Sequence, residues 1–225
     1  QDKIGADPTG LPFNSVIALE LHGGKPLSPL VNAGAIATTS LINAENIEQR
    51  WQRILHIQQQ LAGEQVALSD EVNQSEQTTN FHNRAIAWLL YSAGYLYCDA
   101  MEACDVYTRQ CSTLLNTIEL ATLGATLAAG GVNPLTHKRV LQADNVPYIL
   151  AEMMMEGLYG RSGDWAYRVG LPGKSGVGGG ILAVVPGVMG IAAFSPPLDE
   201  DGNSVRGQKM VASVAKQLGY NVFKG

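Results

Sequence analysis

A glycine-rich segment that runs directly into an apolar stretch places the strongest constraint on how this chain folds. Residues 173–180 read Gly-Lys-Ser-Gly-Val-Gly-Gly-Gly, and residues 181–185 are all apolar. A short apolar run bounded by glycines is typical of a buried strand. Small residues also allow a ligand to approach the backbone closely. We therefore expect Lys174 and Ser175 to lie where a strand begins or along the wall of a cleft, where they can hold an anionic group and hand over protons.

The triplet Gly-Lys-Ser at residues 173–175 is also the last part of a phosphate-binding P-loop. That motif requires a glycine five residues before the glycine of the triplet, and this chain has Arg168 there. A P-loop also leads into a helix, whereas a strand is expected to follow here. We reject the P-loop on both grounds. A glycine-rich turn between strands remains the alternative when the triplet is considered alone.

The hydrophobic pattern predicts helices over most of the chain before Gly157. Apolar spacing, capping residues and glycine stops indicate helices at 32–42, 43–61, 69–73, 84–91, 99–111, 116–130 and 144–157. Asn116 followed by Glu119 is typical of a capping box, and Asp144 is expected to cap the helix after it. The segment 13–21 fits either a strand or a helix.

The character of the sequence changes after Gly157. Residues 174–196 predict two or three strands with a hairpin at Pro186–Gly187. Residues 205–218 predict a last helix with one apolar side.

Length and composition are those of an ordinary globular protein, with 225 residues of which 46% are hydrophobic and 16% charged. We expect one mixed α/β (α+β) domain over residues 1–225. Its helical lobe would cover about 32–157, and its sheet with the terminal helix about 168–222. A ligand site would lie between the lobe and the sheet edge.

The charge and the cysteine content limit which partners and which cellular compartment we expect for this chain. The formal net charge is −5, and acidic and basic residues are mixed along the chain. Because there is no basic stripe, we expect no nucleic-acid partner. No apolar run approaches the ~20 residues that span a bilayer, so no membrane partner is expected. The three cysteines lack a disulfide-framework spacing, which favours a reducing, cytoplasmic compartment. The four histidines form no ligand pair at i and i+4, so we propose no metal.

Short blocks that follow one order along almost the whole chain resemble the serine-dependent glutaminases, which have a β-lactamase-like fold. The blocks are Asp7–Asn14, Val31–Ile36, Ser75–Glu76 with Asn83, Tyr107 before Cys111–Ser112, Gly157–Tyr159, Val169–Val177, Ser195–Asp199 and Gly202–Ser204. No single block is specific, but their number and order are. Penicillin-recognising serine hydrolases carry Lys-Thr-Gly in a place comparable to residues 174–176. The resemblance implies an antiparallel sheet flanked by helices, plus a helical lobe.

The same resemblance implies hydrolysis of L-glutamine to L-glutamate and ammonia through an acyl-serine intermediate. It implies no cofactor and a homo-oligomer. The family positions that match Asn32, Asn83 and Tyr107 contact substrate, and the position that matches Glu76 holds the substrate ammonium. A carboxylate suits an ammonium, and polar donors suit the substrate carboxylate.

The resemblance assigns the catalytic roles to the later part of the chain. Tyr159 is expected to act as a proton relay beside the nucleophile, and it also faces the substrate. The backbone N–H of Val177 is assigned to the oxyanion hole. Lys174 and Ser175 are expected to support the site.

Each of these residues also has a plain structural interpretation. Asn32 and Asn83 could be helix caps, and Glu76 could be a solvated acid on a polar loop. A tyrosine at helical spacing, such as Tyr107, is usually a core residue whose hydroxyl is satisfied. The spacing from Glu76 to Asn83 inside a matching block favours the functional interpretation. Tyr159 comes just after a helix end, among small residues, where its hydroxyl can enter a cleft.

The nucleophile of the family, a serine in Ser-x-x-Lys, matches no position here, because it lies upstream of the block at Asp7. We expect this chain to be a truncated part of a longer enzyme, with a substrate-binding remnant without catalysis as the alternative. The motif Ser213-Val-Ala-Lys216 is in the wrong order and on the polar side of a helix, so we expect it not to be catalytic. A β-lactamase-type hydrolase is disfavoured, because those enzymes meet an acylated amine and the Asn32 and Glu76 blocks fit a free one.

Overall fold

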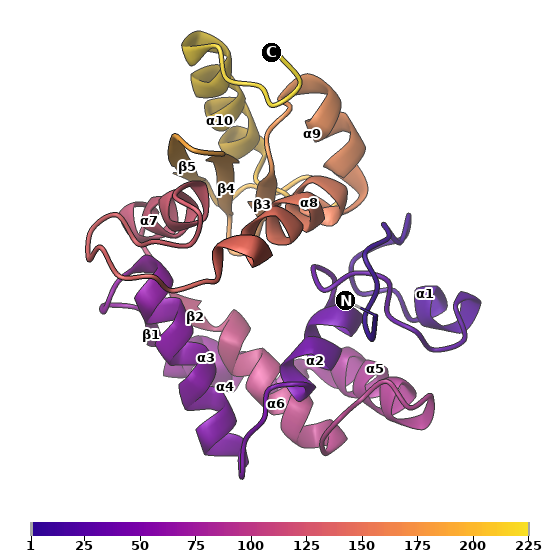
Figure 1. Cartoon of the computed structure of the whole chain (residues 1–225). Coiled ribbons are helices and arrows are strands. Elements are labelled where there is room, and N and C mark those ends of the chain that lie inside the picture. The colour runs from indigo at the N-terminus through magenta and orange to yellow at the C-terminus, as the bar shows by residue number, and fades with distance from the viewer. Residues whose placement is uncertain (1, 225) are drawn as a thin grey trace. The chain divides into compact units, whose positions relative to one another are not determined.

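The structure is a computed structural model that describes residues 2–224 (Figure 1). Within these residues the elements follow in the order α1 (Val16–Leu21), α2 (Asn32–Ser40), α3 (Ile47–Ala62), β1 (Ala67–Leu68), α4 (Asp70–Thr79), α5 (Phe81–Ser92), α6 (Ala100–Cys111), β2 (Thr113–Leu114), α7 (Thr117–Ala128), η1 (Ala143–Asn145), α8 (Val146–Glu156), η2 (Tyr159–Arg161), α9 (Ser162–Arg168), β3 (Gly173–Ser175), β4 (Gly180–Val185), β5 (Met189–Phe194) and α10 (Val205–Leu218). The chain divides into two compact units. Unit 1 is the chain up to Ile57 with Val66–Leu114, and unit 2 is Gln58–Gln65 with the chain from Leu115 onward.

Unit 1 is mainly helical, and its core lies where α2, α5 and α6 pack together. Ile36 of α2 and Ile86 and Leu90 of α5 are fully buried there. Burying each such side chain contributes roughly 1.5–3 kcal/mol. A Cβ on Gly34 would lie 1.8 Å from the carbonyl oxygen of Ser28. Only glycine fits at that approach, so the first turns of α2 are held in a fixed place within unit 1.

The helix predicted at 69–73 is longer in the structure. Ser69 caps α4 by accepting a hydrogen bond from the N–H of Val72 at 3.3 Å, as the sequence suggested. The helix then continues to Thr79. Its residues are almost all polar and none is buried, so no apolar periodicity marks its second half in the sequence. Two-residue strands β1 and β2 pair beside it in antiparallel register.

Unit 2 is built on a three-stranded antiparallel sheet in the order β3–β4–β5. Neighbouring side chains of a strand point to opposite faces. Leu182 of β4 lies against Gly124 of α7, whereas Ile181 lies against Gly207 of α10. The two helices therefore cover opposite faces of the sheet (Figure 1).

Helix α8 ends directly against β3, and this contact positions the glycine-rich segment. A Cβ on Gly157 would lie 1.7 Å from the carbonyl oxygen of Gly173. The N–H of Ser175 donates to the carbonyl of Gly157 at 3.0 Å. The backbone after α8 is thus bonded to the strand that carries the Lys-Ser pair.

Most of the local predictions in unit 2 are confirmed. The hairpin at Pro186–Gly187 joins β4 to β5, and α10 has the predicted bounds. The capping box is present, because Asn116 and Glu119 each accept a hydrogen bond from the other's N–H, at 3.0 and 2.8 Å. The prediction that Asp144 caps the next helix is wrong. Asp144 lies inside the short helix η1, and α8 begins without a side-chain cap.

The division into a helical lobe over about 32–157 and a sheet part over about 168–222 stays a prediction about domains, although α7 and α8 both fall in unit 2. Of the helices described, none is long and apolar enough to cross a membrane. Residues 2–224 also contain no group of three or more His, Cys, Asp or Glu side chains that could hold a metal ion.

Candidate functional site

The residues predicted to form the site fall into two groups, one in each compact unit. Unit 1 carries the four that were expected to bind substrate, which are Asn32, Glu76, Asn83 and Tyr107. Unit 2 carries the four that were expected to act in or support catalysis, which are Tyr159, Lys174, Ser175 and Val177.

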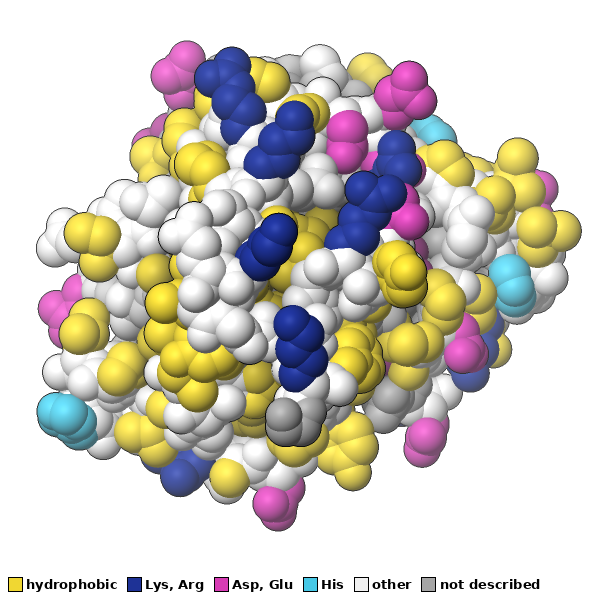
Figure 2. All heavy atoms as spheres, turned by 90° about the horizontal axis from the view of Figure 1, so that it is seen from above, with side chains coloured by type: hydrophobic (Ala, Val, Ile, Leu, Met, Phe, Trp, Pro, Cys, Tyr) yellow, Lys and Arg dark blue, Asp and Glu magenta, His cyan; other side chains and the backbone are white. Residues whose placement is uncertain are grey.

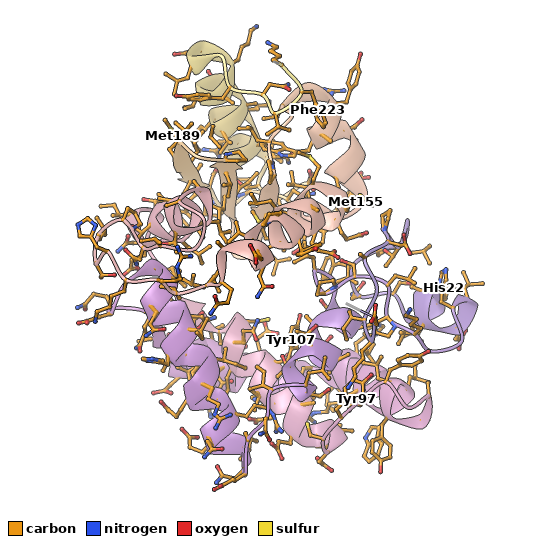
Figure 3. The ribbon with its side chains drawn as sticks, in the orientation of Figure 1. His22, Tyr97, Tyr107, Met155, Met189 and Phe223 are labelled. Carbon is orange, nitrogen blue, oxygen red and sulfur yellow. The ribbon has the colours of Figure 1, made fainter. Side chains whose placement is uncertain are left out.

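Three of the four residues in unit 1 are joined by side-chain hydrogen bonds. The amide nitrogen Nδ2 of Asn32 donates to Oδ1 of Asn83 at 2.8 Å. Tyr107, which is labelled in Figure 3, lies on α6, and its hydroxyl donates to Oδ1 of Asn32 at 3.1 Å. We call Asn32, Asn83 and Tyr107 the amide cluster. The residues come from three different helices, and 75 positions separate the first from the last, so only the tertiary fold brings them together.

Neither asparagine of the amide cluster caps a helix, so the structural alternative proposed for both is wrong. Asn32 is the first residue of α2, whose N-cap is Val31. Asn83 is the third residue of α5, whose N-cap is Asn80. The Asn32 side chain instead bonds to both Asn83 and Tyr107, and the Asn83 side chain accepts from Asn32. Hydrogen bonds at both ends of the Asn32 amide fix its orientation.

The helices beneath the amide cluster are bonded to one another. Nδ2 of Asn80, at the start of α5, donates to the hydroxyl of Thr108 on α6 at 2.9 Å. Thr108 in turn donates to the carbonyl of Cys104 at 2.8 Å. The backbone N–H of Asn32 donates to the carbonyl of Phe13 at 2.9 Å, which ties the start of α2 to the preceding loop. The cluster therefore sits on a rigid base, as a binding site requires.

The structure does not bring Glu76 into contact with the amide cluster. Glu76 is exposed on the last turn of α4, and its carboxylate forms no hydrogen bond or ion pair with any residue in the range 2–224. The neighbouring Gln77 donates from Nε2 to the carboxylate of Asp105 on α6 at 2.9 Å. This bond anchors the end of α4 and leaves the Glu76 carboxylate facing outward. Its predicted role on an ammonium group stays a prediction.

In unit 2, Tyr159, Lys174 and Ser175 lie together where α8 ends on β3. The hydroxyl of Tyr159 donates to the carbonyl oxygen of Ser175 at 3.3 Å. The Lys174 ammonium lies 4.3 Å from the centroid of the Tyr159 ring and donates to the carbonyl of Gly157 at 3.3 Å. It also donates to the same Ser175 carbonyl. A phenol and an ammonium that share one acceptor can pass a proton between them and a bound group.

Tyr159 is held in an unusual backbone conformation. Its φ of 53° lies in the left-handed region, which costs a non-glycine residue of order 1 kcal/mol or more. Ser162 braces the segment, because its hydroxyl accepts from the N–H of Leu158 at 2.9 Å and donates to the carbonyl of Tyr159 at 2.9 Å. Nδ2 of the fully buried Asn203 donates to the carbonyl of Leu158 at 3.2 Å. The surrounding bonds thus hold the tyrosine in place despite the strain.

Ser162 and Asn203 were not predicted as site residues. Asn203 lies in the block 202–204 that contributed to the family resemblance, but no role was attached to it. A buried asparagine between glycine and serine gives no sign in the sequence of which carbonyl it will bond. The sequence therefore showed that Asn203 matches the family, but it did not indicate what the side chain does.

The hydroxyl of Ser175 is buried without a partner. The residue is 2% exposed, and its Oγ forms no hydrogen bond with the described part of the chain. A buried polar atom left unpaired costs about 1–3 kcal/mol. Because the unpaired Oγ belongs to a residue that also bonds to Tyr159 and Lys174, we interpret it as a group that bonds to a ligand.

Val177 lies in an open turn after β3, and its side chain is 56% exposed. The turn is closed by the N–H of Gly176 to the carbonyl of Gly180 at 3.0 Å and by the N–H of Gly179 to the carbonyl of Gly176 at 2.9 Å. The N–H of Val177 bonds to no residue between 2 and 224. A Cβ added to Gly176 or Gly178 would meet nothing within 4 Å. The backbone at Val177 is therefore accessible, as an oxyanion-hole donor requires.

Ser213 and Lys216 lie where the sequence predicted, on the exposed side of α10. The hydroxyl of Ser213 accepts from Nε2 of Gln217 at 3.0 Å. No hydrogen bond joins Ser213 to Lys216 within the described chain. A serine without a base next to it is a poor nucleophile.

Comparison with known proteins identifies the family of the chain. The family model described as Glutaminase matches residues 1–223. A glutaminase of Shigella boydii is 98% identical over 225 residues, which are all of this chain and 73% of that protein. The crystal structure of a probable glutaminase of Bacillus subtilis superposes with a TM-score of 0.95 at 34% identity and covers 99% of this chain and 75% of that one.

A further structure is that of a Bacillus subtilis glutaminase in covalent complex with 5-oxo-L-norleucine, formed by reaction with 6-diazo-5-oxo-L-norleucine. It superposes with a TM-score of 0.88 at 30% identity over 99% of this chain and 73% of that one. These matches confirm the predicted mixed α/β fold and the predicted resemblance. The chain belongs to the glutaminase family.

Proposed function

We propose that this protein hydrolyses the side-chain amide of L-glutamine, giving L-glutamate and ammonia. Membership of the glutaminase family supports this function. The observation in the structure that carries the proposal is the amide cluster, where Asn32, Asn83 and Tyr107 are fixed by mutual hydrogen bonds of 2.8 and 3.1 Å.

The amide cluster suits one end of an amino-acid substrate. Nδ2 of Asn83 donates to no described residue, so both of its hydrogens are available. Amide donors held in a fixed geometry suit the α-carboxylate of glutamine. In the proposed complex the exposed carboxylate of Glu76 pairs with the α-ammonium.

The residues of unit 2 suit the reacting end of the substrate. In the proposed mechanism a serine oxygen attacks the side-chain amide carbon, and the N–H of Val177 bonds the oxygen that becomes negative. The lysine of the Ser-x-x-Lys motif takes the proton of the serine hydroxyl, and with the help of Tyr159 this proton reaches the amide nitrogen, so that the C–N bond breaks and ammonia leaves. Water then cleaves the acyl-serine ester and releases glutamate. Lys174 and the carbonyl of Ser175 hold the tyrosine in position, and the Ser175 hydroxyl, which has no partner among the described residues, bonds to the substrate.

We further propose that the attacking serine belongs to a Ser-x-x-Lys segment outside these 225 residues. Ser213 has no base beside it, and the Ser175 hydroxyl is buried without a partner. The relatives are longer than the matched part, since this chain spans 73% of the glutaminase of Shigella boydii. The covalent complex of the Bacillus subtilis glutaminase supports a nucleophile in the family.

The proposed setting is a cytoplasmic homo-oligomer that uses no cofactor and has no nucleic-acid or membrane partner. Cys98, Cys104 and Cys111 form no disulfide in the described range, which suits a reducing compartment. The oligomeric state is proposed from the family resemblance alone.

Ammonia release measured on two lengths of the protein tests the proposed function. The longer version includes the preceding residues of the enzyme and should hydrolyse glutamine at an enzymatic rate. The chain 1–225 alone should bind L-glutamate yet retain at most the ~10³–10⁴-fold acceleration over water that survives loss of a nucleophile. A longer version that neither binds nor hydrolyses glutamine would sink the proposal. Full turnover by 1–225 would place the nucleophile within this chain, with Ser175 and Ser213 as the first candidates.

A further inference from the structure

A hollow in unit 2 is lined by none of the residues proposed for the glutaminase site. It has a volume of about 420 Å³ and lies between the ends of α9 and α10 and the segment that follows α10. Its walls are Val169, Ala212, Ala215 and Tyr220, and none of the eight proposed site residues lines it. A volume of this size falls in the range of small-molecule sites.

The charged residues around this hollow are all of one sign. Arg168, Lys209, Lys216 and Lys224 line it, and no Asp or Glu does. Figure 2 looks onto this face and shows dark blue side chains gathered around a depression with a yellow floor. We call these four residues the cationic ring. None of them forms an ion pair with a residue in the described range.

Three arginines outside the cationic ring, Arg50, Arg109 and Arg161, are neutralised by carboxylates, whereas no member of the ring has such a partner among residues 2–224. Arg109 pairs with Asp105 at 2.7 Å and with Glu48 at 2.9 Å. Arg161 pairs with Asp201 at 3.0 Å and with Asp164 at 3.2 Å. A protein whose formal net charge is −5 thus leaves four cations unpaired around one hollow.

The negative ends of nearby helix dipoles offset only part of the positive charge of the cationic ring. Arg168 and Lys216 lie in the last turns of α9 and α10, where a cation offsets the negative helix end. Each helix end carries roughly half a unit of negative charge, so the two ends together offset about one of the four positive charges. About three charges remain uncompensated.

The wall of the hollow is a fixed part of the fold. The N–H of Val222 donates to the carbonyl of Gly170 at 2.9 Å, and Nδ2 of Asn221 donates to the carbonyl of Val169 at 3.2 Å. Gly170 has a φ of 66°, and a Cβ there would lie 2.3 Å from the Asn221 side chain. The segment after α10 is therefore fastened to the end of α9, so the hollow is preformed.

We propose that the cationic ring binds a small anion with two linked phosphoryl groups, either free or as part of a nucleoside diphosphate. Diphosphate carries about the charge that the ring leaves uncompensated. An arginine can bond one phosphoryl group in a bidentate manner, while lysines act as point charges on the other. The site lies outside the proposed glutaminase machinery and does not depend on it.

Titration calorimetry with inorganic pyrophosphate and with ADP, at 50 and 200 mM NaCl, tests the site on the intact protein. We expect a dissociation constant below about 1 mM at the lower salt concentration for at least one probe, and weaker binding at the higher one. Tighter binding of ADP identifies a nucleotide as the source of the diphosphate, and tighter binding of pyrophosphate identifies the free anion. No binding of either probe at 10 mM overturns the proposal.

Matched variants locate the binding. Lys209→Ala with Lys216→Ala should weaken binding at least tenfold, and Lys209→Gln alone should weaken it less, in the same direction. The control Arg206→Ala with Lys138→Ala removes the same charge from exposed positions that do not line the hollow, and binding should change by less than twofold. Equal weakening by the two double variants would show that only net charge matters, and would overturn the proposal. Circular dichroism confirms that each variant is folded.

Discussion

Replacement of Asn32 by alanine tests whether the amide cluster is a binding site or only part of the core. The change removes two side-chain hydrogen bonds, of 2.8 Å to Asn83 and 3.1 Å to Tyr107. Each is worth roughly 0.5–1.5 kcal/mol. Without them Asn83 and Tyr107 must be ordered by the ligand, so binding loses up to the same free energy. We expect L-glutamate to bind roughly 5- to 150-fold more weakly, which corresponds to about 1–3 kcal/mol.

Calorimetric titration with L-glutamate is the suitable assay, because binding of the product requires no nucleophile. Tyr107→Phe removes the 3.1 Å bond to Asn32 but leaves the bond between Asn32 and Asn83 in place, so it should weaken binding less, by roughly 2- to 12-fold. In the double variant the two effects should be less than additive, since the residues share that bond. The control is Asn43→Ala, which removes an exposed asparagine of unit 1 and should leave binding within about twofold.

A variant that loses thermal stability but keeps its affinity for L-glutamate would refute this reasoning. Loss of two hydrogen bonds should lower the melting temperature by a few degrees, at roughly 2–4 °C per kcal/mol for a chain of this size. If Asn32→Ala melts earlier but binds L-glutamate as tightly as the unmodified protein, the amide cluster only supports the packing of α2, α5 and α6. Glutamine would then have to be bound elsewhere.

Three further predictions concern single side chains. Glu76→Gln in the complete enzyme should lower kcat/KM for glutamine by roughly 30-fold or more, the usual effect of breaking a charge pair with substrate, and unchanged kinetics would exclude a contact with the ammonium. Ser213→Ala should leave turnover within about twofold, as for most surface changes, whereas a thousandfold loss would identify the nucleophile. Burial raises the pKa of the Cys104 thiol to about 11, so at pH 8 only roughly one molecule in a thousand carries the reactive thiolate there. Iodoacetamide should therefore modify the exposed Cys111 first, and peptide mass spectrometry showing equal rates would contradict this.

Local chemistry was predictable where neighbouring residues decide the structure. The capping box of Asn116 and Glu119, the hairpin at Pro186–Gly187 and the bounds of α10 are all confirmed. These features depend on residues within a few positions of one another, so a pattern contains the whole interaction. The prediction for Asp144 was wrong because the chain forms η1 there, a choice that a capping pattern does not specify.

The sequence by itself determined the family, the mixed α/β fold and the identity of the candidate residues, because matching blocks preserve both residue type and order. Only the tertiary structure decided which of them touch. It joined Asn32, Asn83 and Tyr107, and it left Glu76 apart from them. The left-handed backbone of Tyr159 and the unpaired hydroxyl of Ser175 also emerge only in three dimensions. Hydrogen bonds, burial and strain depend on distances between segments far apart in the chain, and a linear pattern does not contain those distances.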